Sequence, residues 1–128
     1  MVGRFILRRF HAFKHAFAGW NYVLKTQENA WLHVLATGSV LLLASWMGLP
    51  ARDWAVLILA IALVWAAEFI NTSLEAVVDL ASPIKHPLAK VGKDVGAAAV
   101  LIAALSSVVI GLLILGPPLW SRLEGFWK

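Results

Sequence analysis

Three carboxylates and one amide are spaced along residues 68–79, EFINTSLEAVVD, so that a helix would gather them on one side. The four residues are Glu68, Asn71, Glu75 and Asp79. At 3.6 residues per turn, the last three lie within about 60° of the first. Carboxylates stacked in this way repel one another, and either a divalent cation or protonation of one of them relieves the repulsion. Oxygen ligands suit Mg²⁺, which takes one or two carboxylates together with substrate phosphates. A carboxylate left over in a half-dry site could act as a general base.

The loop that follows carries the opposite charge. Within SPIKHPLAKVGKDVG (82–96), the basic side chains that could hold phosphates are Lys85, His86, Lys90 and Lys93, and Asp94 comes directly after them. The structural alternative is that a lysine of this loop pairs with a buried acid of the preceding stretch. Gly92 and Gly96 stand four apart, a spacing that favours close helix packing over ligand contact. Neither a P-loop nor a GxGxxG motif occurs.

The elements that must position these residues are membrane helices. Of 128 residues, 61% are hydrophobic and 14% are charged, whereas soluble domains are about half apolar and about a quarter charged. Three apolar runs cover 34–51, 54–67 and 95–120, and the second is long enough to span only if its helix continues through the acidic stretch. We expect one domain, 1–128, with spans at about 30–49, 53–80 and 91–119.

The distribution of lysine and arginine sets the expected orientation. Both are concentrated before the first span and in the 80–94 loop, which the positive-inside rule places in the cytoplasm. The N-terminus and the acidic stretch then face the cytoplasm, where nucleotides are. Basic loops beside anionic lipid account for the net charge of +4 without a nucleic-acid partner.

Residues 3–25 carry one apolar helical stripe, formed by Ile6, Phe10, Phe13, Phe17 and Trp20. The pattern is typical of an amphipathic helix that lies at the membrane surface or packs against the spans.

Acidic residues for Mg²⁺, basic residues for phosphate and a position at headgroup depth together suggest phosphoryl transfer to a lipid. The alternative, from a different class, is a non-enzymatic transporter or channel in which Glu68, Glu75 and Asp79 relay ions. A relay more naturally lies at the bilayer midplane, and it would not need the basic loop.

The combination of E68-F-I-N71-T-S-x-E75-A-V-V-D79 with H86-P-L-A-K90-V-G-K93-D94 resembles the prokaryotic diacylglycerol kinase family, which includes the undecaprenol kinases of Gram-positive bacteria. The resemblance extends to K-T-Q-E-N-x-x-x-H (25–33) and covers essentially the whole chain. It implies an all-α integral membrane fold, a homotrimer with sites between protomers, and a bacterial inner-membrane location. The implied reaction uses Mg²⁺ and ATP to phosphorylate undecaprenol or diacylglycerol, and the loop sequences look more like the undecaprenol branch.

The resemblance also implies roles for individual residues. Glu68 matches the general base and Glu75 a Mg²⁺ ligand. The positions implied to contact ATP are Asn71, Asp79, Lys85, His86, Lys93, Asp94, Arg8 and His15. The family's second metal-binding glutamate falls on Gln27, with Glu28 next to it. Adjacent helix positions point about 100° apart, so either a local shift brings Glu28 to the metal or Gln27 binds it more weakly. We expect Glu28.

Overall fold

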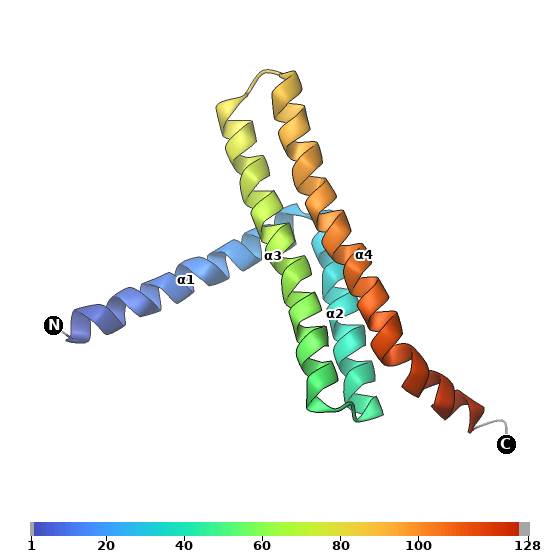
Figure 1. Cartoon of the computed structure of the whole chain (residues 1–128). Helices are drawn as coiled ribbons and strands as arrows, with labels where there is room; N and C mark the ends of the chain where they lie inside the picture. The colour runs from blue at the N-terminus through green and yellow to red at the C-terminus, as the bar shows by residue number, and fades with distance from the viewer. Residues whose placement is uncertain (1, 126–128) are drawn as a thin grey trace. The chain divides into compact units, whose positions relative to one another are not determined.

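The computed structural model describes residues 2–125, with side chains described for residues 11–125. Four helices follow one another in the described chain: α1 (Val2–Thr26), α2 (Glu28–Met47), α3 (Ala51–Ala81) and α4 (Pro87–Glu124) (Figure 1). Every regular element in residues 2–125 is therefore helical, as expected. Two compact units make up the chain, Met1–Leu32 and His33–Lys128. The expectation of one domain stays a prediction.

Within the first unit, Gln27 separates α1 from α2. Its backbone N–H donates to the Val23 carbonyl at 2.9 Å, and its own carbonyl accepts from the Ala30 N–H at 3.2 Å. The residue thus ends one helix and begins the next. Along α1, Phe13 and Phe17 are exposed, as an apolar face that meets lipid would be.

Helices α2, α3 and α4 are each long and apolar enough to cross a membrane. The 20 residues of α2 span about 30 Å at 1.5 Å per residue, which matches the hydrocarbon core of a bilayer. Leu42, Leu59 and Leu113 are among many large apolar side chains that are exposed. Such exposure would be costly in water and is expected against lipid.

The turn between α2 and α3 forms at Gly48, directly before Leu49 and Pro50. Gly48 has φ +67°, a left-handed conformation that glycine adopts without steric cost. The Leu49 N–H donates back to the Ala44 carbonyl at 3.4 Å, the closing bond of a Schellman motif. A small apolar core, centred on Ala44, Met47, Leu57 and Leu115, packs beside this turn.

Helices α3 and α4 pack against each other as an antiparallel hairpin, joined by the 82–86 loop (Figure 1). Their 31 and 38 residues correspond to about 46 and 57 Å, more than a bilayer core of about 30 Å requires. The hairpin is therefore longer than the core. Its joined end carries the acidic stretch on α3 and the basic loop.

The third span differs most from expectation, because α4 begins at Pro87 and continues past 119 to Glu124. Pro117 and Pro118 lie inside it. Proline removes the backbone bond to the residue four positions earlier, yet the helix continues, and Ser121 Oγ donates to the Pro117 carbonyl at 3.0 Å.

Candidate active site

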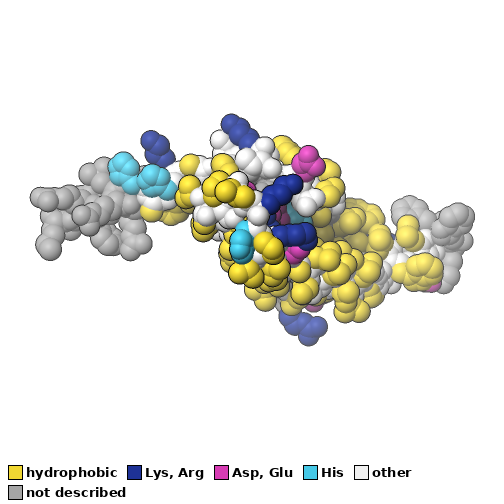
Figure 2. Space-filling model, turned by 90° about the horizontal axis from the view of Figure 1, so that it is seen from above, with side chains coloured by type: hydrophobic (Ala, Val, Ile, Leu, Met, Phe, Trp, Pro, Cys, Tyr) yellow, Lys and Arg dark blue, Asp and Glu magenta, His cyan; other side chains and the backbone are white. Residues whose placement is uncertain are grey.

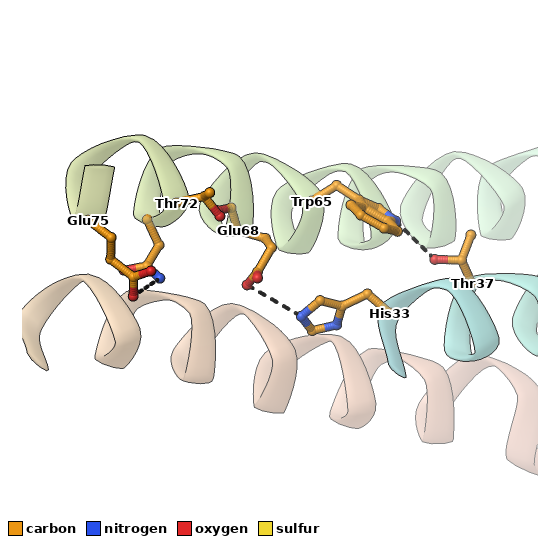
Figure 3. Close-up of polar contacts among 7 residues, drawn as sticks. His33, Thr37, Trp65, Glu68, Thr72 and Glu75 are labelled. Atoms are coloured by element: carbon orange, nitrogen blue, oxygen red, sulfur yellow. Dashed lines mark hydrogen bonds and ion pairs between the residues drawn. The ribbon is translucent and has the colours of Figure 1, made fainter. Parts of the chain in front are cut away.

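Three polar side chains are buried on α3: Glu68, Asn71 and Thr72. Glu68 is 3% exposed, and a carboxylate so deeply buried is costly unless it has a partner. His33, on α2, supplies one, since its Nε2 lies 3.7 Å from Glu68 Oε2 (Figure 3). The Thr72 hydroxyl donates at 2.9 Å to the Glu68 backbone carbonyl and leaves the carboxylate to other partners.

His33 is braced from α3 by Trp65. The two rings meet edge to face, with centroids 5.9 Å apart and planes at 68°, a favourable arrangement for π-systems. Trp65 Nε1 donates to Thr37 Oγ1 at 3.1 Å, which ties α3 back to α2 (Figure 3). In the sequence His33 appears only as the last position of the 25–33 motif, and its residue type alone implies no role there. The available signal was a titratable side chain at the edge of an uncharged span.

Asn71 orients Glu75 one helical turn further along α3. Asn71 Nδ2 donates to Glu75 Oε1 at 3.1 Å, the i, i+4 contact that the spacing of the acidic stretch allows. Glu75 is half-buried. Asn71 Oδ1 is buried without a hydrogen-bond partner in the described structure, and it faces Gly96 of α4.

Gly96 of α4 packs tightly against this part of α3. A Cβ added there would overlap Asn71 Oδ1 and come within 3.2 Å of Leu74 Cδ2. Of the two glycines, Gly96 thus fits the helix-packing interpretation, while Gly92 would meet Val78 Cγ2 only at an ordinary 3.8 Å.

We expect Gly96→Ala to destabilise the protein by about 1–3 kcal/mol, the usual cost of overpacking, and to lower activity by displacing Asn71. Gly92→Ala is the matched control and should change stability by less than about 1 kcal/mol. Thermal unfolding in detergent measures both. Equal effects of the two substitutions would contradict the assigned contact.

A second, more exposed region lies at the loop end of the hairpin. A pocket of about 680 Å³ opens there, and basic, acidic and histidine side chains gather at this end (Figure 2). Its charged and histidine lining consists of Asp79, Lys85, His86, Lys90, Lys93 and Asp94. Five of the residues expected to contact ATP therefore share one pocket. Asn71, the sixth on this hairpin, lies deeper along α3.

Two ion pairs lie at this pocket. Lys93 of α4 pairs with Asp79 of α3, and Lys90 pairs with Asp94 one turn further along α4. The pairing of a loop lysine with an acid is the structural alternative raised by the sequence, but it involves Asp79 and not Glu68. Asp79 is 67% exposed and Lys93 37%, and exposed pairs contribute only about 0–1 kcal/mol. A phosphate group could therefore compete for Lys93 at little cost.

His86 has a structural role as well as an expected binding role. Its Nδ1 accepts the Leu88 backbone N–H at 3.2 Å and caps α4, with Pro87 as the first helical residue. In the neutral ring this leaves the proton on Nε2, which can donate to an anion. Among the residues whose side chains are described, Lys85 and His86 form no ion pair.

The remaining predicted residues belong to the first unit. Glu28 is exposed and Gln27 is half-buried. Gln27 lies between α1 and α2 and not inside a helix. The 100° angle expected between adjacent helix residues therefore does not describe Gln27 and Glu28. His15 is exposed on α1, and the Arg8 side chain lies outside the described residues. The metal role of Glu28 or Gln27 stays a prediction.

The donor set fits Mg²⁺ only together with a phosphate ligand. Within residues 11–125, no three His, Cys, Asp or Glu side chains gather closely enough to hold a metal ion. Mg²⁺ binds through one or two carboxylates plus substrate phosphates and water. Glu75, held by Asn71, can provide one such carboxylate.

Comparison with known proteins gives a match to the family model described as prokaryotic diacylglycerol kinase over residues 14–115. A diacylglycerol kinase of Synechocystis is 43% identical over 86% of this chain and 63% of its own length. An undecaprenol kinase of Bacillus subtilis is 38% identical over 88% of this chain and 91% of its own. A diacylglycerol kinase of Escherichia coli is 35% identical over 79% and 85%. The chain thus spans less than two thirds of the Synechocystis protein but most of the other two.

Proposed function

Because the chain belongs to the prokaryotic diacylglycerol kinase family, a family of membrane lipid kinases, we propose that it transfers the γ-phosphoryl group of ATP to the hydroxyl of undecaprenol or diacylglycerol. The observation that supports the proposal is the order in which three kinds of site follow one another along α3. A buried carboxylate, Glu68, comes first, then the Asn71–Glu75 pair, and then the basic pocket at Asp79. Eleven residues from Glu68 to Asp79 correspond to about 16 Å of helix, a distance that suits an elongated nucleotide.

In this proposal Glu68 accepts the proton of the lipid hydroxyl. The hydroxyl oxygen forms a bond to the γ-phosphorus as the bond from that phosphorus to the bridging oxygen of ADP breaks, and the proton remains on Glu68 until water removes it. Lys85, His86 and Lys93 bind the phosphates and offset their charge. Bound Mg²⁺ neutralises phosphate charge, and Glu75, with Glu28 or Gln27, would hold it.

Phosphoryl transfer depends mainly on positioning and charge neutralisation, so a site without a P-loop can perform it. The bilayer contributes to the positioning, because a lipid alcohol already lies at headgroup depth. We propose that the site faces the cytoplasm at the inner leaflet of a bacterial membrane, which agrees with the basic residues of the 82–86 loop and α4. We also propose a homotrimer, which mass measurement in detergent would test.

The direct test is lipid phosphorylation by the purified protein in micelles that hold undecaprenol and diacylglycerol together. With ATP and Mg²⁺, we expect phosphorylated lipid, no product after chelation of Mg²⁺, and undecaprenol as the preferred acceptor. Preference for diacylglycerol would overturn the substrate choice alone. No lipid product from either acceptor, with ATP-independent ion movement in vesicles, would overturn the kinase proposal in favour of the transporter.

Lys93→Ala separates phosphate binding from stability. We expect the KM for ATP to rise by about 10- to 100-fold, equal to the 1.5–3 kcal/mol of a charge-assisted hydrogen bond, because Lys93 lines the pocket. Stability should change by less than about 1 kcal/mol, since its ion pair with Asp79 is exposed. ATP titration and thermal unfolding measure the two effects. A clearly lowered unfolding temperature with an unchanged KM would make Lys93 a structural residue.

A further inference from the structure

We propose that His33 is a positioning residue for Glu68, and that it holds one carboxylate oxygen so that the other faces the lipid hydroxyl. This inference rests on the proposed function, in which Glu68 is the base. The sequence pattern of acids on α3 gives His33 no part, because His33 lies on α2 and reaches Glu68 only through helix packing.

The first support is that, in the part of the chain whose side chains are described, His33 Nε2 and the Glu68 carboxylate have no ion-pair or hydrogen-bond partner other than each other. Glu68 is 3% exposed and the His33 side chain 14%. His33 supplies the one ion-pair contact to Glu68 among residues 11–125. His33 Nε2 is buried and makes no hydrogen bond within the described structure. A buried polar atom without a hydrogen bond is unfavourable, so a hydrogen bond between His33 Nε2 and Glu68 Oε2 would stabilise both groups.

The second support is that the ring is braced in the orientation that the contact needs. Trp65 packs edge to face against it, and Thr37 fixes the Trp65 indole through the 3.1 Å hydrogen bond. The separation of 3.7 Å exceeds hydrogen-bonding distance. Catalytic hydrogen bonds are often long without substrate and tighten in the reacting complex. A small side-chain rotation would therefore complete the bond.

The third support is the place of His33 between an apolar cavity and the carboxylate. A cavity of about 380 Å³ runs between α2, α3 and α4, and His33 is its one titratable lining residue among the described side chains. Glu68 does not line this cavity. His33 therefore separates Glu68 from the apolar interior and limits the directions from which a hydroxyl reaches it.

The proton balance of the proposed step does not change with His33 in place. The ring donates its Nε2–H to Glu68 Oε2 and keeps that proton throughout. The hydroxyl proton passes to Oε1, which the hydrogen bond to Oε2 leaves facing the substrate. His33 thus acts through Glu68 and does not itself touch the reacting atoms.

The test compares His33→Gln, His33→Asn and His33→Ala in the lipid phosphorylation assay. A glutamine amide nitrogen can reach the position of Nε2, whereas an asparagine amide reaches only that of Nδ1. We expect Ala and Asn to lower kcat by about 10- to 100-fold, the loss typical of an orienting partner. Gln should stay within about fivefold of the parent protein, and the KM for ATP should change little in all three.

His11→Gln, an exposed histidine of α1, is the control and should leave kcat unchanged. Rescue by Gln but not by Asn, with similar thermal unfolding of the two variants, supports positioning through Nε2, because a packing role would lower stability together with kcat. A kcat within twofold of the parent in all three His33 variants, or equal losses in Gln and Asn, overturns the inference. An inactive parent protein would instead overturn the proposed function, so the two failures are distinguishable.

Discussion

Glu68→Gln is expected to lower kcat for lipid phosphorylation by about 10²- to 10⁴-fold, the range that a general base contributes. The substitution keeps the size and one oxygen of the side chain but removes its capacity to accept a proton. Since Glu68 does not line the basic pocket, the KM for ATP should stay within about threefold of the parent value. Initial rates against ATP at saturating lipid measure both constants.

The matched control for this substitution is Glu124→Gln at the far end of α4. Glu124 is exposed and accepts a hydrogen bond from Trp120 Nε1 at 2.6 Å, which the glutamine carbonyl can also accept. We expect its kcat to equal that of the parent. If Glu68→Gln kept more than a tenth of the parent kcat while folded, Glu68 would not be the base and the buried carboxylate would need another explanation.

The helices and the turn were predictable because each depends on local sequence. The apolar runs set the spans, and Gly48 with Pro50 sets the turn between α2 and α3. The distal end of α4 was not predictable in the same way. Proline usually ends a helix, yet α4 continues through Pro117 and Pro118 to Glu124.

The contacts of the candidate site also fall into those set by local sequence and those set by packing between helices. The alignment of Asn71 with Glu75 follows from helical spacing alone, and the structure contains the hydrogen bond that this spacing allows. The contact between His33 and Glu68 depends on how α2 packs against α3. The fit of Gly96 over Asn71 depends in turn on how α4 packs against α3. A single sequence carries no direct signal for such contacts between helices.

Burial also distinguishes three acids that helical spacing places on the same face of α3. Glu68, Glu75 and Asp79 share a helical face, yet Glu68 is buried, Glu75 is half-buried and Asp79 is exposed. The gradient arises because α3 emerges from the packed region toward the loop. It supports different tasks for the three acids, with proton acceptance at the dry end and nucleotide binding at the wet end.

Glu75→Gln is expected to lower kcat/KM for Mg·ATP by at least about 100-fold. Removing a residue that only supports a metal ligand already costs up to about 100-fold, and Glu75 is proposed to be a ligand itself. The glutamine Oε1 can still accept the Asn71 Nδ2 hydrogen bond that Glu75 accepts at 3.1 Å. The loss would therefore come from the missing charge and not from the missing contact. The Mg²⁺ concentration for half-maximal activity should rise in parallel, because a neutral amide binds this hard cation more weakly.

Asn71→Ala provides the comparison, since it removes the orienting amide but leaves the Glu75 charge. We expect a smaller loss, about 10-fold in kcat/KM, with a smaller rise in the Mg²⁺ requirement. Glu28→Ala and Gln27→Ala, measured in the same titration, decide which of these two neighbours is the second ligand. If Glu75→Gln left the Mg²⁺ requirement unchanged, the acid at this position would not hold the metal, and the role of the α3 carboxylates would have to shift to Asp79.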